Sequence, residues 1–402
     1  MKIAFVDNLP VGGGLSRYSL GLCKNLTNEY PDIVIDYYIH DDNVKRMEEL
    51  FLIDRVNVIV LKSTKGKGRL ALYSNKILRK FNRKSRKDAI LYEIENCITS
   101  KYDLAYFPTA HMMKRPSLTI PVVGTFHDFN WKYFFGSTIF DESFIKMMNL
   151  ETVKWFQNGE NITLSNFVAN EAKKLFPKAS NFPSVIHIGS LSVYNEITED
   201  RANEILKDLK IDWPYILFPG NFFPHKNHLN LFTGFNLLKQ KSGFENYKLL
   251  LTGVGSEQIK YGFAEYRGVR LSTDQDYDVR GMGYQSNEFM DALISKAKLM
   301  VSPSIYEEMC LPALDAWSFG TPTAISNIPP FKEHETVLGI KSAFFDPMNP
   351  FDIAEVLAQY LNNYEQAKSD GAYSKLKMGE NNWVTITNKY MAVFEKAIQK
   401  NK

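Results

Sequence analysis

Cysteine is scarce in this chain, and its three residues lie far apart, at Cys23, Cys97 and Cys310. An odd number of widely spaced cysteines gives neither a disulfide framework nor a zinc-binding spacing, and it is typical of a reducing compartment. No apolar run approaches the roughly 20 residues that a membrane-spanning helix needs. The chain starts on a strand-like segment without a basic-then-apolar leader. We therefore expect a cytoplasmic protein.

Net charge is also small, because 48 Lys and Arg residues stand against 45 Asp and Glu residues and leave +3. So small a charge gives no reason to expect a nucleic-acid partner. The sequence has no internal repeat and no low-complexity tract. Its 402 residues, 45% of them hydrophobic, are enough for two globular domains that each bury a core.

Short apolar runs alternate with helical or polar segments, which predicts an α/β protein with parallel sheets wound in βα units. A polar stretch over 190–212 separates two halves of similar size. We expect a first Rossmann-like domain over 1–195 and a second over 205–380, with a final helix over 383–400 that packs back on the first. The predicted strands are 3–6, 34–39, 56–61, 104–107, 122–126, 162–165 and 185–189, then 215–220, 247–252, 279–283, 299–302, 323–326 and 343–347.

The most informative stretch runs from Ser302 to Glu333. A strand ends at Ser302, and Pro312 then suits the first turn of a helix, where its missing N–H is harmless. Helix N-termini carry free N–H groups and partial positive charge, so they hold phosphates. Glu307 before this helix and Asp315 one turn into it can accept hydrogen bonds from sugar hydroxyls. The combination predicts a nucleotide-sugar site.

A glycine-rich turn, Gly12 to Gly14, lies between the first predicted strand and a helix over 16–27. Glycine lets the backbone approach a ligand closely, although a tight strand-to-helix turn explains such a cluster equally well. The dinucleotide fingerprint needs a third glycine where Arg17 stands, and no acidic residue follows at the right distance. A nicotinamide enzyme is therefore disfavoured.

Residues 62–87 contain eleven Lys or Arg and no acidic residue. Apolar residues recur within this stretch at spacings of three and four, so an amphipathic helix with a basic face is predicted. Two interpretations stay open. The basic face contacts an anionic membrane peripherally, at the inner face, or it is solvated while the apolar stripe packs on the domain core.

Nearly the whole chain, and most strongly residues 220–333, resembles the retaining glycosyltransferases related to sucrose synthase, glycogen synthase and the bacterial capsule and lipopolysaccharide transferases. The resemblance implies the GT-B fold, in which two doubly wound, Rossmann-like domains face a cleft. Two family glycines are replaced here by Glu308 and Cys310, and the second acid of the motif is Asp315 instead of Glu. The matching positions are Pro303, Ser304, Tyr306, Glu307, Leu311 and Pro312.

The resemblance implies roles for the residues of the second half. Glu307 would hold hydroxyls of the donor sugar, Asp315 those of the ribose, and Lys226 would neutralise the departing diphosphate. The amides of Met309, Cys310 and Leu311 would hold the distal phosphate. Other donor-binding positions are Asn221 after the first strand of this half, Gly253 at a turn, and Tyr284 in the segment that contacts the base.

For the first half, the resemblance implies that His127 lies near the reacting sugar, although a histidine packed at a strand end is a competing interpretation. Asp128, the next residue in the chain, could orient the ring. Gly13 and Gly14 would lie near the phosphates and the acceptor. Glu333 has a weaker match to the family pattern. Asp274, Asp276 and Asp278 look like the metal motif of the other glycosyltransferase fold, but they fit solvated turn acids better. No metal ion is therefore expected.

The expected reaction transfers a hexose from a UDP- or GDP-linked donor to a saccharide or lipid-linked acceptor, with retention and without a further cofactor. This activity is typical of surface polysaccharide or glycolipid synthesis. Two alternatives remain: a nucleotide-sugar-binding subunit without activity, favoured by the altered loop around Glu308, and a sugar-nucleotide epimerase on the same fold.

Overall fold

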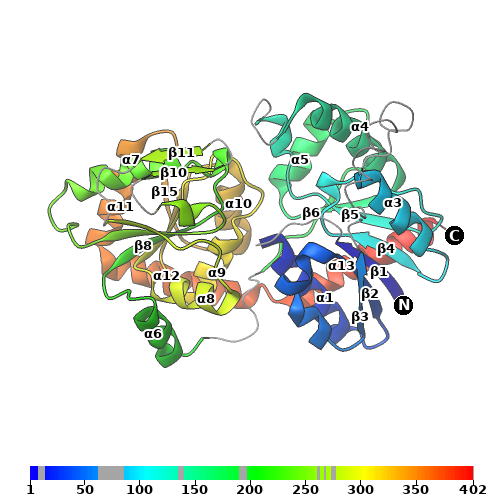
Figure 1. Cartoon of the computed structure of the whole chain (residues 1–402), viewed down its shortest axis with the longest axis horizontal. Coiled ribbons are helices and arrows are strands. Elements are labelled where there is room, and N and C mark those ends of the chain that lie inside the picture. The colour runs from blue at the N-terminus through cyan, green and yellow to red at the C-terminus, as the bar shows by residue number, and fades with distance from the viewer. Residues whose placement is uncertain are drawn as a thin grey trace, which may run out of the picture.

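The computed structural model describes residues 1–7, 14–61, 86–134, 140–189, 197–259, 263–266, 269–272 and 278–401. Two parallel sheets form the centres of two domains, which Figure 1 shows side by side. The predicted class, an α/β protein of two doubly wound domains, is confirmed. Gly12, Gly13, the basic stretch up to residue 85, Asp274 and Asp276 lie outside the described residues.

The first sheet has seven strands in the order β3-β2-β1-β4-β5-β6-β7, and all of its pairs are parallel. Its strands are short and, apart from the two edge strands, mostly buried, as expected where helices cover a parallel sheet. The strands are β1 (Lys2–Asp7), β2 (Val34–His40), β3 (Val56–Leu61), β4 (Leu104–Phe107), β5 (Val122–Thr125), β6 (Glu160–Thr163) and β7 (Ser184–Val185), and the described helices between them are α1 (Gly14–Glu29), α3 (Arg86–Cys97), α4 (Glu142–Asn158) and α5 (Asn166–Leu175).

The second sheet has six parallel strands in the order β12-β9-β8-β13-β14-β15, and a small antiparallel pair stands apart from it. The strands are β8 (Tyr215–Pro219), β9 (Lys248–Thr252), β12 (Val279–Gly281), β13 (Leu299–Ser302), β14 (Thr323–Ser326) and β15 (Ala343–Phe345), with β10 (Phe263–Tyr266) and β11 (Val269–Ser272) as the separate pair. The helices are α6 (Glu199–Asp208), α7 (His228–Lys239), α8 (Asn287–Lys296), α9 (Leu311–Phe319), α10 (Pro329–Leu338), α11 (Pro350–Asn362) and α12 (Tyr364–Glu380).

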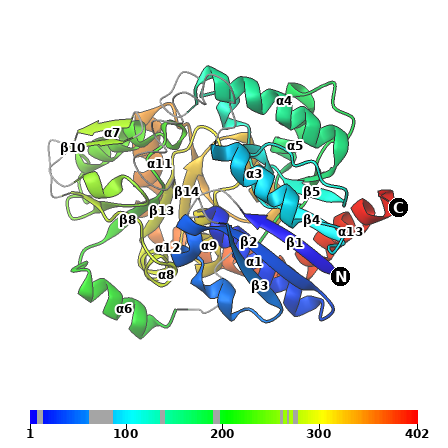
Figure 2. The same cartoon turned by 45° about the vertical axis from the view of Figure 1, so that its right-hand side comes forward.

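The last helix, α13 (Trp383–Lys400), leaves the second domain and packs against α1 and the strands β4 to β6 of the first. Figures 1 and 2 show it running beside the first sheet. Tyr390 Oη lies 2.6 Å from Tyr18 Oη inside the first domain, and Lys396 Nζ lies 2.8 Å from a carboxylate oxygen of Glu160 in β6. The chain therefore crosses between the domains twice.

Strand order determines where ligands approach such sheets. In each sheet the order reverses between two central strands, β1 and β4 in the first and β8 and β13 in the second. Open α/β sheets bind ligands beyond the carboxyl ends of strands at such a reversal. Among the described residues, the start of α1 is the next segment after β1, the Lys226 segment follows β8, and the Glu307 loop follows β13. The topology therefore places the predicted site residues at the binding edges of both sheets.

The separating stretch 190–212, predicted as a polar linker, contains helix α6. Thr198 caps this helix by accepting a hydrogen bond from the Arg201 N–H, and its apolar residues Ala202 and Ile205 pack against Ala292 of α8. Charged residues occupy the opposite face of α6. The stretch is therefore polar on average, and its composition alone does not indicate a helix. The last strand of the first sheet, predicted over 185–189, has only the two residues of β7.

Candidate functional site

Lys226 and Glu307 form an ion pair, with Lys226 Nζ bound to Glu307 Oε1. Burial would lower the pKa of Lys226, but the facing carboxylate of Glu307 raises it, so the ammonium stays charged. Ser304 Oγ donates to the same carboxylate oxygen at 2.8 Å. The two segments are joined by their backbones, because the Ile305 N–H donates to the His225 carbonyl at 2.9 Å. The segments after β8 and β13 that carry the pair are therefore joined directly.

The N-terminus of α9 follows Glu307 directly. Cys310 is its N-cap residue and makes no side-chain cap within the described part of the chain, and Pro312 stands in the first turn. The N–H of Leu311 donates to the Met309 carbonyl at 3.1 Å, so one of the three amides predicted to hold a phosphate is already used. Burial raises the pKa of the Cys310 thiol to about 11, so this side chain brings no negative charge to the helix start.

Arg17 and Asp315 link the two domains at the same place. Arg17 Nη1 in α1 lies 2.6 Å from Asp315 Oδ2 in α9, and the Asp315 side chain is fully buried. Gly14, the first residue of α1, has Leu311 so close that an added Cβ would overlap the Leu311 side chain. The N-terminal turns of α1 and α9 thus meet directly. A larger residue at position 14 would require the Leu311 side chain to move.

His127 follows β5 and is 7% exposed. Its Nδ1 lies 3.0 Å from Glu308 Oε2, and its Nε2 lies 2.8 Å from the Pro108 carbonyl oxygen. Burial lowers the pKa of His127 to about 4. The expectation that Asp128 orients this ring was wrong, because Glu308 makes that contact across the domain boundary, while Asp128 Oδ1 accepts from the Asn130 N–H at 3.1 Å.

The predicted donor-binding turns of the second domain pack together. Asn221 Oδ1 accepts from the Val254 N–H at 2.8 Å, and an added Cβ on Gly253 would lie 2.7 Å from the Gly220 carbonyl. Gly253 also has a φ of +103°, which a side chain would strain. Tyr284, 45% exposed, follows Gly283 at the edge of this cluster. Asn221 therefore joins the turns after β8 and β9.

Further contacts between the domains involve Glu333 of α10. Its carboxylate accepts from the N–H groups of Asn166 and Phe167 at the start of α5, at 2.6 and 3.0 Å, and lies 2.6 Å from His187 Nε2. Figure 1 shows α5 and α10 at the junction of the domains. Anionic groups stabilise helix N-termini, so Glu333 acts as a cap supplied by the other domain. Nearby, Tyr306 Oη accepts from the Phe129 N–H at 3.1 Å.

A set of buried polar atoms near His127 has no hydrogen-bond partner among the described residues. These are Asp7 Oδ1 at the end of β1, and Thr109 Oγ1 and His111 Nδ1 in the segment after β4. The His111 and His127 rings lie 5.2 Å apart. Burial raises the pKa of Asp7 to about 7. Buried polar atoms are nearly always paired, so these atoms can bond to groups other than the residues that the structure describes.

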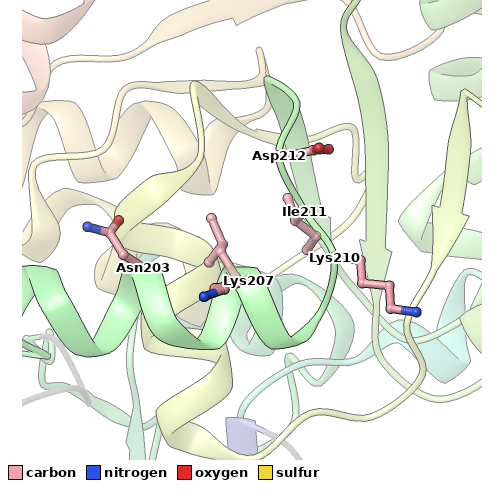
Figure 3. A pocket seen from close by; sticks show the side chains of 6 residues that line it. Asn203, Lys207, Lys210, Ile211 and Asp212 are labelled. Atoms are coloured by element: carbon pink, nitrogen blue, oxygen red, sulfur yellow. The ribbon is translucent and has the colours of Figure 1, made fainter.

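One surface hollow, of about 430 Å³, lies beside α6 and is lined by Asn203, Leu206, Lys207, Lys210, Ile211 and Asp212. Figure 3 shows these side chains around it. None of them belongs to the residues assembled above. In the described parts of the chain, no three His, Cys, Asp or Glu side chains are grouped to hold a metal ion, and no helix is long and apolar enough to span a bilayer.

Two residues of this site, Arg17 and Glu308, were not predicted as functional. The sequence marked each one only as a departure, Arg17 from the dinucleotide fingerprint and Glu308 from the family glycine. Their partners are 298 and 181 residues away in the chain, a separation at which sequence spacing gives no signal. Gly13, also predicted here, lies outside the described residues.

Residues 202–377, which span most of the second domain, match the model of the family described as glycosyl transferases group 1. O-antigen chain mannosyltransferase B of Escherichia coli is 27% identical over 205 residues, which are 50% of this chain and 51% of that protein. MMP alpha-(1->4)-mannosyltransferase of Mycolicibacterium hassiacum is 28% identical over 114 residues, 28% of each chain. The matched region thus spans about half the length of the first relative and less of the second.

Solved structures match over the whole chain. A glycosyltransferase from Rickettsia africae superposes with a TM-score of 0.65 at 16% identity, covering 100% of this chain and 99% of that one. HepE of Anabaena, solved with UDP-glucose, gives 0.64 at 14% identity over 98% of both chains. WaaG, a glycosyltransferase involved in lipopolysaccharide biosynthesis, gives 0.65 at 12% over 96% of this chain and 98% of its own. At these identities the likeness shows the fold, which is GT-B.

Proposed function

The chain belongs to the group-1 glycosyltransferases through its second domain, and on this premise we propose that it transfers a hexose from a nucleotide-diphosphate sugar to an acceptor hydroxyl. The proposed donor is UDP- or GDP-linked, and the names of the sequence relatives favour mannose as the sugar. The proposed acceptor is a saccharide or a lipid-linked saccharide of a surface polysaccharide or glycolipid.

The single observation that carries this proposal is the position of Lys226 and Glu307 beside the start of α9. A diphosphate there would meet a charged ammonium and the positive end of a helix dipole. Both stabilise the negative charge that develops on a leaving nucleoside diphosphate, and electrostatic stabilisation of this kind usually contributes more to the rate than any other single effect. Glu307, held by Lys226 and Ser304, would accept hydrogen bonds from the hydroxyls of the transferred sugar.

The acceptor would bind to the first domain. Asp7, Thr109 and His111 present buried polar atoms without partners among the described residues, which suits a ligand rich in hydroxyl groups. In the proposed step the bond between the sugar C1 and the diphosphate oxygen breaks, and a bond from C1 to the acceptor oxygen forms on the same face. The acceptor proton leaves with a phosphate oxygen. Retention of configuration is thus part of the proposal.

The test is a donor panel of UDP-, GDP- and ADP-linked glucose, galactose and mannose, each with saccharide and lipid-linked acceptors. Release of nucleoside diphosphate is measured, and the linkage of the product is determined by NMR. We expect one donor to be consumed with an acceptor and to give an α-linkage. Nucleotide binding without turnover over the whole panel would favour the inactive binding subunit. Conversion of a donor into its epimer without an acceptor would favour the epimerase.

Peripheral membrane contact through residues 62–87 belongs to the same proposal, because eleven basic residues without an acidic one suit an anionic lipid surface. Co-sedimentation with vesicles of anionic and of neutral lipid tests it. Binding to anionic vesicles that decreases with salt is expected. Equal recovery in the supernatant with both vesicle types would contradict it.

A further inference from the structure

Glu308 stands in the loop between β13 and α9, at a position where the resembled family has glycine. Its side chain is 5% exposed and reaches the first domain. The two carboxyl oxygens have different partners there. Oε1 accepts from the Leu164 N–H at 2.6 Å, and Oε2 lies 3.0 Å from His127 Nδ1. A glycine makes neither contact, so this bridge is a property of this chain.

The neighbours of the bridge fix most of its hydrogens. The Pro108 carbonyl can only accept, so His127 Nε2, at 2.8 Å, carries a hydrogen. The Leu164 amide can only donate, so Glu308 Oε1 is an acceptor. One hydrogen is left for the contact between His127 Nδ1 and Glu308 Oε2, and it belongs either to a carboxylic acid or to an imidazolium.

Burial disfavours charge on both groups, and for His127 it outweighs the opposite effect of Asp128 and Asp7, whose negative charges favour the charged ring. Burial raises the pKa of Glu308 well above its ordinary value, and burial lowers the pKa of His127 to about 4. The charged and titratable groups that face the bridge come from both domains. Toward Glu308 they are Asp128, Glu307, Glu333, Tyr306 and Tyr390, and toward His127 they are Asp7, Asp128 and the rings of His111 and Tyr18. The acids toward Glu308 also oppose its ionisation.

We propose that Glu308 is a protonated carboxylic acid that donates its O–H to His127 Nδ1 and so positions this ring when the two domains close. The bond between Glu308 and His127 is inferred from the geometry. Its consequence for turnover rests on the proposed glycosyltransferase function. Glu308 belongs to the second domain, and His127 and Leu164 belong to the first. The bond therefore forms only when the domains meet, and it fixes the neutral ring with its hydrogen on Nε2.

Protonation of Glu308 also removes an electrostatic repulsion from the proposed donor site. Glu308 immediately precedes the residues at the start of α9 that are proposed to hold a phosphate. A carboxylate there would repel the diphosphate, whereas a carboxylic acid does not. The resembled family avoids the repulsion with glycine, and this chain avoids it by keeping the acid neutral. Glu308 is therefore a positioning residue and not a proton carrier in the transfer step.

Glutamine is the matched substitution, because its amide oxygen accepts from Leu164 and its NH₂ donates to His127 Nδ1 at every pH. The first readout is the ¹⁵N spectrum of histidine-labelled protein at pH 7, with the His127 signals assigned by loss in His127→Gln. We expect a neutral His127 ring protonated at Nε2 in the wild type and in Glu308→Gln. In Glu308→Ala the Nδ1 signal is expected to shift to that of a nitrogen without its hydrogen bond. Glu335→Gln, an exposed acid of α10, is the control and leaves the signals unchanged.

The second readout is turnover of the donor identified by the panel. Glu308→Gln is expected to keep kcat and KM within about threefold, and Glu308→Ala to raise the donor KM by about tenfold, the value of one hydrogen bond. Wild-type activity is expected to fall at high pH where Glu308→Gln does not. An imidazolium in the wild type that is lost in Glu308→Gln would overturn the proposal, as would an Nδ1 signal that Glu308→Ala leaves unchanged. Absence of turnover with the expected spectra would instead count against the transferase function alone.

Discussion

The guanidinium Nη1 of Arg17, in the first turn of α1, lies 2.6 Å from Oδ2 of Asp315, in the middle of α9. The residues come from different domains, and Asp315 is fully buried. Asp315 is the acid that the family resemblance assigns to the ribose hydroxyls. An acid proposed to bind the donor is thus also a point of contact between the domains. If Asp315 binds the ribose as proposed, donor binding and domain contact share one carboxylate.

Replacement of Arg17 by Leu is expected to destabilise the protein by roughly 3 kcal/mol, because it leaves a buried carboxylate without its cation. Urea denaturation followed by tryptophan fluorescence measures the loss. The double variant Arg17→Leu/Asp315→Leu is expected to recover part of it. Arg201→Leu is the matched control, since Arg201 pairs with Glu204 and Glu288 at the surface and such pairs contribute roughly 0–1 kcal/mol. Asp315→Leu completes the double-mutant cycle. If the effects of the two single substitutions add up to that of the double variant, the pair is not coupled.

Replacement of Lys226 by Met is expected to lower the rate of sugar transfer by about 100-fold or more, because one charged donor to the leaving group is lost. Lys226→Arg keeps the charge and is expected to lie between Met and the wild type. Turnover is measured with the donor from the panel. Lys241→Met, which removes an exposed partner of Glu355 on the surface, is the control. Wild-type turnover in Lys226→Met would remove Lys226 from the proposed site.

Asp7 predicts a pH dependence of stability. Burial raises its pKa to about 7, while the unfolded chain has an ordinary value near 3.9. Between these values the folded state binds the extra proton, so stability falls as pH rises, by about 4 kcal/mol in total. Asp7→Asn lacks this loss and is expected to be more stable than the wild type at pH 8 and not at pH 4. A difference in unfolding free energy between wild type and variant that stays constant from pH 4 to 8 would contradict this. Asp54→Asn, at an exposed position, is the control.

Glu333 predicts a pH dependence of stability with the opposite sign to that of Asp7. Burial alone would raise its pKa, but hydrogen bonds from His187, Asn166 and Phe167 lower it below the ordinary value. Its contribution to stability is therefore fully present above about pH 4.5 and is lost as the pH falls through the lowered pKa. Glu333→Ala is expected to lower the Tm at pH 7. The difference in Tm between the variant and the wild type is expected to become smaller at acidic pH. An equal shift in Glu335→Ala, the exposed neighbour in α10, would mean that the contacts to α5 contribute nothing.

Most strands of both sheets were predictable because a buried parallel strand is a short apolar run, as in Leu104–Phe107 and Leu299–Ser302. Helix α12 was not predicted, because its buried residues Ala367, Gly371, Ser374 and Met378 recur at helical spacing but are mostly small and only weakly apolar. Gly371 is buried there against the Gly320 carbonyl, a contact that a Cβ would prevent. Close backbone packing thus hides the helix from a search for large apolar residues.

The site was predictable only within each domain. The segment around Lys226 and the loop around Glu307 carry local motifs, and the structure brings these two side chains together. Contacts between the domains, such as His127 with Glu308 and Asn166 with Glu333, depend on how two separately folded surfaces meet. The spacing of residues in the sequence does not predict which side chains of the two domains come into contact.

Helix α13 has a consequence for synthesis of the chain. Its Tyr390 completes the buried hydroxyl cluster of Tyr18, Tyr106 and Thr125, yet it follows the whole second domain in sequence. At roughly 5–20 residues per second, a ribosome needs roughly 10–40 seconds for the roughly 200 residues between β7 and α13. During this time the nascent first domain lacks one of its walls and exposes the apolar face that α13 later covers. The nascent chain therefore has a period in which a chaperone is expected to bind the first domain.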